Sequence, residues 1–283
     1  MKPIIHPFFD PATNTVTYLV ADSVTRKAAI IDPVLDFDPK AGRLAAASAD
    51  AVLEKARGGG FEIVWILETH AHADHLSAAD HLRHATGAAV VIGRRIDTVQ
   101  KTFGELFETD APTRVFDRLV DEGDMLELGE LAISVMHTPG HTPACVTYLI
   151  GDAAFVGDTL FMPDYGTARA DFPGGDAGEL YRSIRRILAL PPETRIFVCH
   201  DYLPAGRTAY AWETSVAAER AGNIHVHDGV SEAEFVAMRT ARDATLAAPT
   251  LILPSLQVNI QAGALPTPSA KGRVFLKLPV NAL

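Results

Sequence analysis

Two observations predict that this chain of 283 residues has a mixed α/β (α+β) fold. Short apolar runs rich in β-forming residues alternate along the sequence with Ala-, Leu- and Arg-rich stretches whose apolar residues recur at helical spacing. Hydrophobic residues make up 48% of the chain and charged residues 21%, which is typical of soluble globular proteins. The chain can therefore bury a sizeable core, as one large domain or two small ones.

The apolar runs predict strands over residues 15–21, 28–31, 63–67, 89–92, 132–136, 146–150, 153–156 and 195–199. Helices are predicted over residues 42–57, 76–85 and 177–188, because each stretch ends at a glycine or just before prolines. Ser231, with Glu234 three residues later, forms the pattern of a capping box and predicts a further helix that reaches residue 244.

The charge and the apolar runs exclude several classes of protein. Lys and Arg number 25 against 35 Asp and Glu, a net charge of −10 that disfavours binding to nucleic acid. The longest apolar runs fall short of the roughly 20 residues that a membrane-spanning helix needs. His6, Pro7 and Asp10 interrupt the N-terminal stretch where a signal peptide would be apolar. We therefore expect a cytoplasmic protein, with Cys145 and Cys199 as buried, unbonded thiols.

The segment His70-Ala71-His72-Ala73-Asp74-His75 carries the strongest chemical signal. It follows the predicted strand 63–67 and precedes the predicted helix 76–85. On an extended backbone His70 and His72 point to the same side, while Asp74 and His75 lie at the turn into the helix. Imidazole and carboxylate ligands suit Zn and Fe, so this pattern favours a metal site. The alternative is a helix N-terminus capped by Asp74.

Three further motifs follow predicted strands: Thr138-Pro139-Gly140-His141, Gly157-Asp158-Thr159 and Cys199-His200-Asp201. Each is weak by itself, because a single loop histidine or a Gly-Asp-Thr turn is common. Loops at the ends of neighbouring strands converge on one edge of a sheet. Every candidate ligand precedes residue 205, so we predict a catalytic domain over residues 1–205 and a C-terminal helical extension, residues 206–283, packed on the same domain.

In the order and spacing of these motifs the sequence resembles the metallo-β-lactamase superfamily over residues 14–202. The resemblance implies a four-layer αββα sandwich with a metal site at one edge of its two sheets. It also implies up to two ions: the first is surrounded by His70, His72 and His141, the second by Asp74, His75 and His200, and Asp158 can bridge them.

Within that superfamily, Arg169-Ala170-Asp171-Phe172 resembles the persulfide dioxygenase branch. The segments TPGHTPACVTYLI, VCHDY and PSLQVNIQAG carry the same likeness. The branch implies oxidation of glutathione persulfide, or a similar small persulfide, by O2 to sulfite and thiol. It implies one Fe(II) per chain on His70, His141 and Asp158, with His72, Asp74, His75 and His200 orienting ligands and waters. Of these, Asp74, His75 and His200 are the predicted catalytic residues.

For substrate binding, the resemblance implies that Arg169 contacts a glutathione carboxylate and that Tyr202 contacts the peptide part. An ion pair between Arg169 and Asp171 is an equally good interpretation. Thr167 and Ala168 stand where human-like members of the branch have Cys and Gly, so another persulfide is an open alternative.

The complete ligand set also suits a glyoxalase II-like thioesterase or lactonase with one or two Zn ions. A metal-stabilised binding protein without activity is a third hypothesis. We expect a small-molecule substrate and O2 as partners, and a homodimer stays open. The remaining histidines are expected to be structural or exposed, with His81 and His84 on a helix surface, His137 in a strand, and His225 and His227 on a surface strand.

Overall fold

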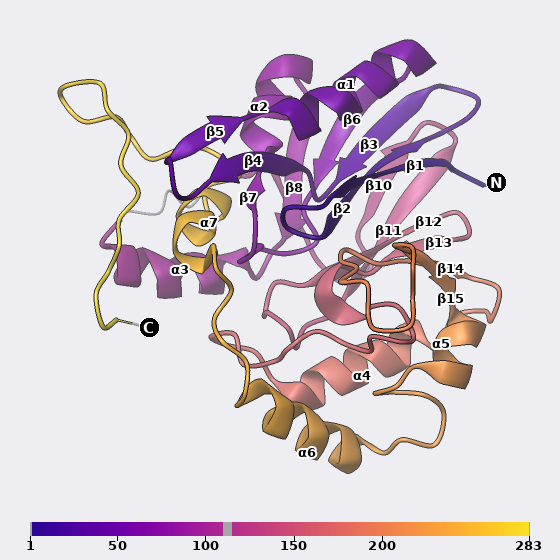
Figure 1. Cartoon of the computed structure of the whole chain (residues 1–283). Coiled ribbons are helices and arrows are strands. Elements are labelled where there is room, and N and C mark those ends of the chain that lie inside the picture. Colours follow the sequence, from indigo (N-terminus) through magenta and orange to yellow (C-terminus); the bar gives the residue numbers. More distant parts are fainter. Residues whose placement is uncertain (1, 110–114, 283) are drawn as a thin grey trace.

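The computed structural model describes residues 2–109 and 115–282, in which two six-stranded sheets face each other and helices cover both outer faces (Figure 1). The first sheet has the strand order β1 (Ile4–Asp10), β2 (Thr15–Ala21), β3 (Lys27–Ile31), β6 (Glu62–Leu67), β8 (Ala89–Gly93) and β9 (Arg118–Val120). Its first three strands pair antiparallel, and β3, β6, β8 and β9 pair parallel.

The second sheet has the order β10 (Met125–Leu128), β11 (Leu131–His137), β12 (Val146–Ile150), β13 (Ala153–Phe155), β14 (Arg195–Phe197) and β15 (Glu213–Ser215). Its pairs are antiparallel except for β13 with β14. A small sheet joins β5 (Arg43–Ala45), β4 (Val34–Asp38) and β7 (Leu76–Ser77). A 3-10 turn, Gly157–Thr159, follows β13.

The helices lie on the outer faces of the two sheets (Figure 1). The first sheet is covered by α1 (Ala47–Gly59), α2 (Ala79–Thr86) and α3 (Ile96–Phe107), with α7 (Ile252–Asn259) beside α3. The second sheet is covered by α4 (Ala177–Ile187), with α5 (Val216–Gly222) and α6 (Glu232–Asp243) on the same side.

Three apolar layers hold this arrangement together, because strand side chains alternate between the two faces of a sheet. In β2, Leu19 packs with the helices of the first sheet, while Val20 packs between the sheets. In β12, Tyr148 packs between the sheets and Leu149 packs toward α4. The four-layer αββα sandwich is therefore confirmed.

Most predicted elements are confirmed, with shifts at their ends. The predicted helix 42–57 is wrong at its start, since Arg43–Ala45 pairs with β4 as β5 and α1 begins at Ala47. The predicted helix 76–85 begins later, at Ala79, because Leu76–Ser77 pairs with β4 as β7. The predicted strand 195–199 ends at Phe197. The capping box of Ser231 and Glu234 is confirmed at the start of α6.

The segment after residue 205 contacts both halves of the sandwich. Strand β15 is the edge of the second sheet, and α6 packs on α4. Helix α7 lies against β7, where the Asn259 side chain accepts a hydrogen bond from Ser77 N (2.7 Å) and donates to the carbonyls of His72 and His75 (both 2.8 Å). The domain division at residue 205 stays a prediction. Among the residues that the structure describes, none of the helices combines the length and apolar character needed to span a bilayer.

Candidate metal centre

The histidines and aspartates of the four motifs meet beyond the carboxyl ends of the strands that precede them. The segment 68–75 follows β6, and Asp158 lies in the 3-10 turn after β13. His141 lies between β11 and β12, and His200 follows β14. These side chains are buried except for Asp74, which is half-buried. The tertiary structure thus brings together all seven ligand candidates predicted from the sequence.

One group of donor atoms is centred on Asp158. Its Oδ2 atom lies 3.9 Å from His70 Nε2 and 3.7 Å from His141 Nε2, and its Oδ1 atom lies 3.3 Å from His200 Nε2. His70, His141 and Asp158 each place one donor atom within 4.8 Å of the others. Two ligands that are each about 2.0–2.2 Å from one ion are separated by no more than about 4.4 Å. The separations of Asp158 Oδ2 from His70 Nε2 and from His141 Nε2 fall inside that limit.

A second group surrounds Asp74. Its Oδ2 atom lies 3.4 Å from His200 Nε2 and 3.5 Å from His75 Nδ1. The hydroxyl of Thr15 lies 3.4 Å from His75 Nδ1 and 3.3 Å from His200 Nδ1, so it contacts both rings on the side away from their Nε2 atoms. Although burial raises the pKa of Asp74, the neighbouring His200 and His75 hold that pKa well below its ordinary value. Asp74 is therefore an anionic donor beside two imidazoles.

The unsatisfied polar atoms of the centre test whether a metal ion fits. Buried polar atoms in folded proteins almost always have a hydrogen-bond partner. Here five buried atoms that could ligate a metal ion form no hydrogen bond among the described residues: His70 Nε2, His72 Nδ1, His75 Nε2, His200 Nε2 and Asp158 Oδ1. Burial, with the nearby His72 and His141, lowers the pKa of His70 well below its ordinary value, which favours the neutral form that binds metal. The residues fit one or more cations.

Two buried carboxylates that the sequence analysis missed orient His72. Its Nε2 atom lies 3.0 Å from Asp32 Oδ1 and 3.3 Å from Glu68 Oε2. Asp32 also accepts hydrogen bonds from the backbone N–H (2.7 Å) and hydroxyl (2.9 Å) of Thr69. Burial opposes protonation of His72, but the two carboxylates raise its pKa well above the ordinary value. With Nε2 engaged and the protonated form favoured, His72 could bind an ion only through Nδ1, after losing the proton that Nδ1 carries. Asp32 directly follows β3. A polar residue just after a strand is the same signal that identified the other candidate ligands.

The ring of His141 is fixed from the opposite side of the centre. Its Nδ1 atom donates to the carbonyl of Arg169 (2.8 Å). The preceding Gly140 has φ = 135°, and a Cβ atom there would lie 2.2 Å from the backbone N of Leu180. Only glycine allows this turn to approach α4 so closely. The predicted tight turn before His141 is thus required by both backbone conformation and packing.

A buried ion pair on α6 holds the segment that receives this hydrogen bond. Arg239 Nη2 lies 2.6 Å from Asp243 Oδ1, and the two residues are 1% and 6% exposed. Arg239 Nη1 donates to the carbonyl of Thr167 (3.1 Å), and Asp243 Oδ2 accepts from Ala170 N (2.9 Å). The C-terminal segment therefore anchors residues 167–170, to which His141 is bonded. Sequence reasoning missed this pair because no local pattern links α6 to the motif of Arg169.

A cavity of about 530 Å³ opens beside the centre and is lined at one part by Asp74, His141 and Asp158. A volume of this size is typical of small-molecule sites. Tyr202 and Arg169, the predicted substrate-binding residues, also line it. The Tyr202 ring is 38% exposed and stacks on the ring of His200, with 5.7 Å between centroids.

Arg169 already has partners in the protein. Its Nε and Nη2 atoms donate to the two carboxylate oxygens of Asp171 at 2.5 and 2.7 Å, and Nη1 donates to the carbonyl of Ala247 (2.7 Å). The interpretation of Arg169 as a loop-holding residue therefore has direct contacts. The substrate roles of Arg169 and Tyr202 stay predictions.

Cys199 is a buried, free thiol as expected, and its Sγ atom lies 3.7 Å from Asp32 Oδ2. The expected surface strand at His225 and His227 is wrong, because neither residue lies in a strand. His225 lies in a turn, half-buried, where its Nδ1 atom accepts from Thr167 N (3.0 Å), and His227 is exposed.

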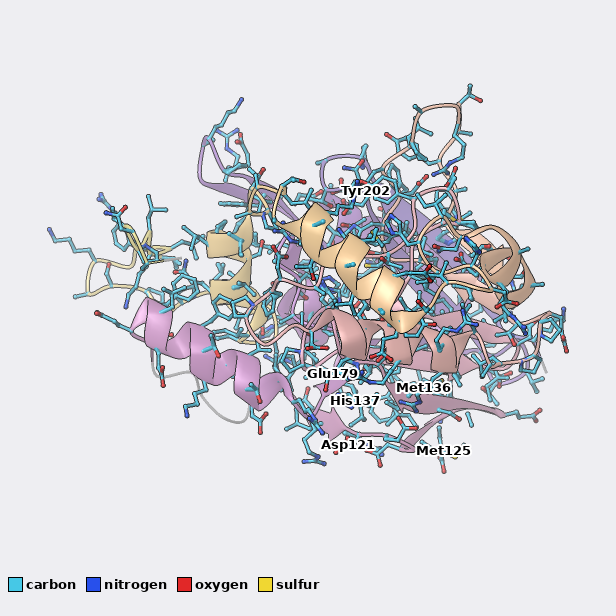
Figure 2. The ribbon with its side chains drawn as sticks, turned by 90° about the horizontal axis from the view of Figure 1, so that it is seen from below. Asp121, Met125, Met136, His137, Glu179 and Tyr202 are labelled. Atoms are coloured by element: carbon cyan, nitrogen blue, oxygen red, sulfur yellow. The ribbon has the colours of Figure 1, made fainter. Side chains whose placement is uncertain are left out.

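His137 is bonded through Nε2 to the carbonyl of Pro143 (3.0 Å). In Figure 2 it lies well away from Tyr202, with α4 and α6 between the two labels. The expectation that His137 is structural agrees with both observations.

The fold and the centre together match a known family. Residues 10–200 match the metallo-beta-lactamase superfamily, and the chain belongs to it as one of its enzymes. The chain is 54% identical to a probable metallo-hydrolase of Burkholderia pseudomallei strain 1710b, over 99% of both proteins. It is 44% identical to glyoxylase B2 of Dictyostelium discoideum, over 99% of this chain and 97% of that protein.

The chain is also similar to persulfide dioxygenases. It is 32% identical to the mitochondrial persulfide dioxygenase ETHE1 of Homo sapiens, over 70% of this chain and 68% of that protein. The crystal structure of ETHE1 from Myxococcus xanthus superposes with a TM-score of 0.75 at 32% identity, covering 92% of this chain and all of that chain. The resemblance to the superfamily, including members of the persulfide dioxygenase branch, is therefore confirmed.

Proposed function

We propose that this chain is a persulfide dioxygenase that uses one Fe(II) ion and acts on glutathione persulfide or a similar small persulfide. The observation that carries the proposal is the group of His70, His141 and Asp158, whose donor atoms lie within 4.8 Å of one another, with His141 and Asp158 lining the cavity. Two imidazoles and one carboxylate on one face of Fe(II) leave open positions, as non-haem iron oxygenases require. The similarity to ETHE1 supports the same assignment.

The proposed reaction converts R–S–SH, O2 and water into R–SH, sulfite and two protons. The S–S bond breaks, the terminal sulfur is oxidised and O2 is reduced. Bound Fe(II) would supply the electron transfer between that sulfur and O2. The protein's residues bind and orient: His70, His141 and Asp158 would hold the ion, and the carbonyl of Arg169 fixes the His141 ring.

The residues around Asp74 support an alternative. Asp74, His75 and His200 form a second set of donors beside the first, which is what a two-zinc thioesterase or lactonase would use. Zn would lower the pKa of a bound water and polarise a carbonyl group. The names of the relatives at 54% and 44% identity favour this hydrolase. In the dioxygenase, the same three residues orient ligands and waters by hydrogen bonds.

The test is O2 consumption by protein loaded anaerobically with Fe(II) and given glutathione persulfide, with sulfite and metal content measured in the same sample. We expect about one sulfite per O2 and one Fe per chain. His70→Ala and Asp158→Ala should abolish both, while His81→Ala, at a histidine on α2 that is paired with Asp50, should not change them. No O2 uptake, together with hydrolysis of an S-acyl glutathione or a lactone by the zinc form, would refute the dioxygenase and favour the hydrolase.

A further inference from the structure

We infer that Arg242 on α6 binds an anionic group, carboxylate or phosphate, of the small molecule that occupies the cavity. The inference rests on the proposed function only in that a small-molecule thiol derivative enters this cavity, and it holds for the dioxygenase and the thioesterase alike.

The cavity has two kinds of wall. The metal-centre residues that line it belong to the segment matched by the superfamily, residues 10–200. A second wall is built from the C-terminal segment and includes Arg239, Arg242, Leu246, Pro249 and Leu251. The residues of this wall lie outside residues 10–200, the segment that matches the superfamily. We therefore expect them to determine which substrate this chain binds.

The arginines of the cavity differ in the charge that remains available. Arg169 is neutralised by the two oxygens of Asp171, and the buried Arg239 is neutralised by Asp243. Arg242 is exposed and forms no ion pair among the residues that the structure describes, and its guanidinium makes none of the hydrogen bonds found there. Its five N–H donors match a carboxylate or phosphate in a bidentate arrangement. Of Arg169, Arg239 and Arg242, it is therefore Arg242 whose charge is available to pair with an anionic ligand.

The helix that carries Arg242 is firmly held. The capping box of Ser231 and Glu234 closes its N-terminus, and the Arg239–Asp243 pair ties its last turn to residues 167–170. A binding group on a rigid element loses less conformational freedom on binding than one on a loop. Arg242 is thus presented from a fixed backbone, and only its own side chain must be ordered by the ligand.

The neighbouring surface defines the rest of the ligand. The cavity that Arg242 lines is also lined by the apolar side chains of Leu246, Pro249, Leu251, Phe37 and Pro39. Such a cavity suits a ligand with an apolar or amide body, an anionic group for Arg242 and a sulfur that reaches the metal centre. A small peptide thiol with free carboxylates and a phosphorylated thiol both have this chemistry.

Binding of the thiols themselves tests the inference without turnover. Isothermal titration of the metal-loaded protein under anaerobic conditions would use three probes: glutathione, glutathione diethyl ester and coenzyme A. We expect glutathione to bind and Arg242→Ala to weaken it about 10-fold, in line with the loss of a charge-assisted hydrogen bond. Arg242→Lys should weaken glutathione binding less than Arg242→Ala does. Lysine keeps the positive charge but cannot donate two parallel hydrogen bonds to one carboxylate. The diethyl ester should bind more weakly and should not respond to Arg242→Ala.

Arg182→Ala is the matched control, because Arg182 is an exposed arginine on α4 that pairs with Glu232 of α6 and does not line the cavity. It should leave all three affinities unchanged. If coenzyme A, and not glutathione, depends on Arg242, the anionic group is a phosphate. The inference is overturned if the wild type binds neither thiol, or if Arg242→Ala changes the acid and the ester equally. Arg242-dependent binding without O2 uptake would refute the proposed dioxygenase and leave the inference standing.

Discussion

Replacing Arg239 by alanine tests the buried ion pair that anchors residues 167–170. Arg239 is 1% exposed, and the change would leave the carboxylate of Asp243, itself 6% exposed, without its counter-ion. Removing one partner of a buried pair costs about 3–5 kcal/mol. Since the total stability of a domain is about 5–15 kcal/mol, we expect a large loss, measured as a shift of the urea midpoint.

The same substitution should reach the metal centre, because the carbonyl of Arg169 would no longer be held against His141 Nδ1. Loss of such outer support typically weakens metal binding by about 10- to 100-fold. Competition with a chromophoric chelator measures this as the Zn dissociation constant at a urea concentration where the variant is folded.

Arg182→Ala supplies the control for both readouts. The Arg182–Glu232 pair joins α4 to α6 at 2.5 Å, but its side chains are 57% and 44% exposed. An exposed pair contributes no more than about 1 kcal/mol. A loss of less than about 1 kcal/mol in the free energy of unfolding of Arg239→Ala would contradict the role given to this buried pair. A Zn affinity equal to that of Arg182→Ala would contradict it as well.

Three further perturbations have expected outcomes. Burial raises the pKa of Glu219 to about 8. Above the ordinary pKa of a glutamate, the unfolded state releases this proton while the folded state keeps it. The stability of the wild type therefore falls as the pH rises from the ordinary pKa of glutamate to about 8. Glu219→Gln should flatten that slope in urea titrations at pH 5 and 9, and parallel slopes would contradict it. Gly140→Ala should cost more than about 1 kcal/mol and reduce bound metal, because its Cβ meets Leu180 at a backbone φ of 135°; a melting temperature and metal content equal to wild type would exclude this. Removal of metal by a chelator should lower the melting temperature, since an ion that binds only the folded state stabilises it by mass action; an unchanged melting temperature after verified removal would argue against a bound ion.

The metal centre was largely predictable from the sequence because its ligands are encoded locally. His70, His141, Asp158 and His200 each follow an apolar run, so a strand and the loop beyond it could be recognised without knowing their partners. The periodicity of the runs also predicted the mixed α/β class, and alternation along β2 placed its side chains in two apolar layers. These features depend on neighbours a few residues away in the chain.

The strands that the sequence did not reveal are those whose structure depends on distant pairing. Arg43–Ala45 lies just before α1, yet its backbone pairs with β4 and becomes β5. Strand β1 pairs with β2 along seven residues, although Pro7 interrupts its pattern. In both strands, backbone hydrogen bonds with a partner strand elsewhere in the chain outweigh local preference. Helix α3 was also missed.

The sequence by itself determined the class of fold, the motifs and the chemical types of the ligands, because these are written in periodicity and in residues close together in the chain. The tertiary structure decided which atoms face a common point and which are already engaged. It placed two carboxylates against His72, tied His141 to α6 through residues 167–170, and, within the part of the chain that the structure describes, left Arg242 without an ion pair. Contacts between motifs that are far apart in the chain, such as those of His200 with Asp74 and Asp158, arise only when the sheets pack, so no local pattern could have specified their geometry.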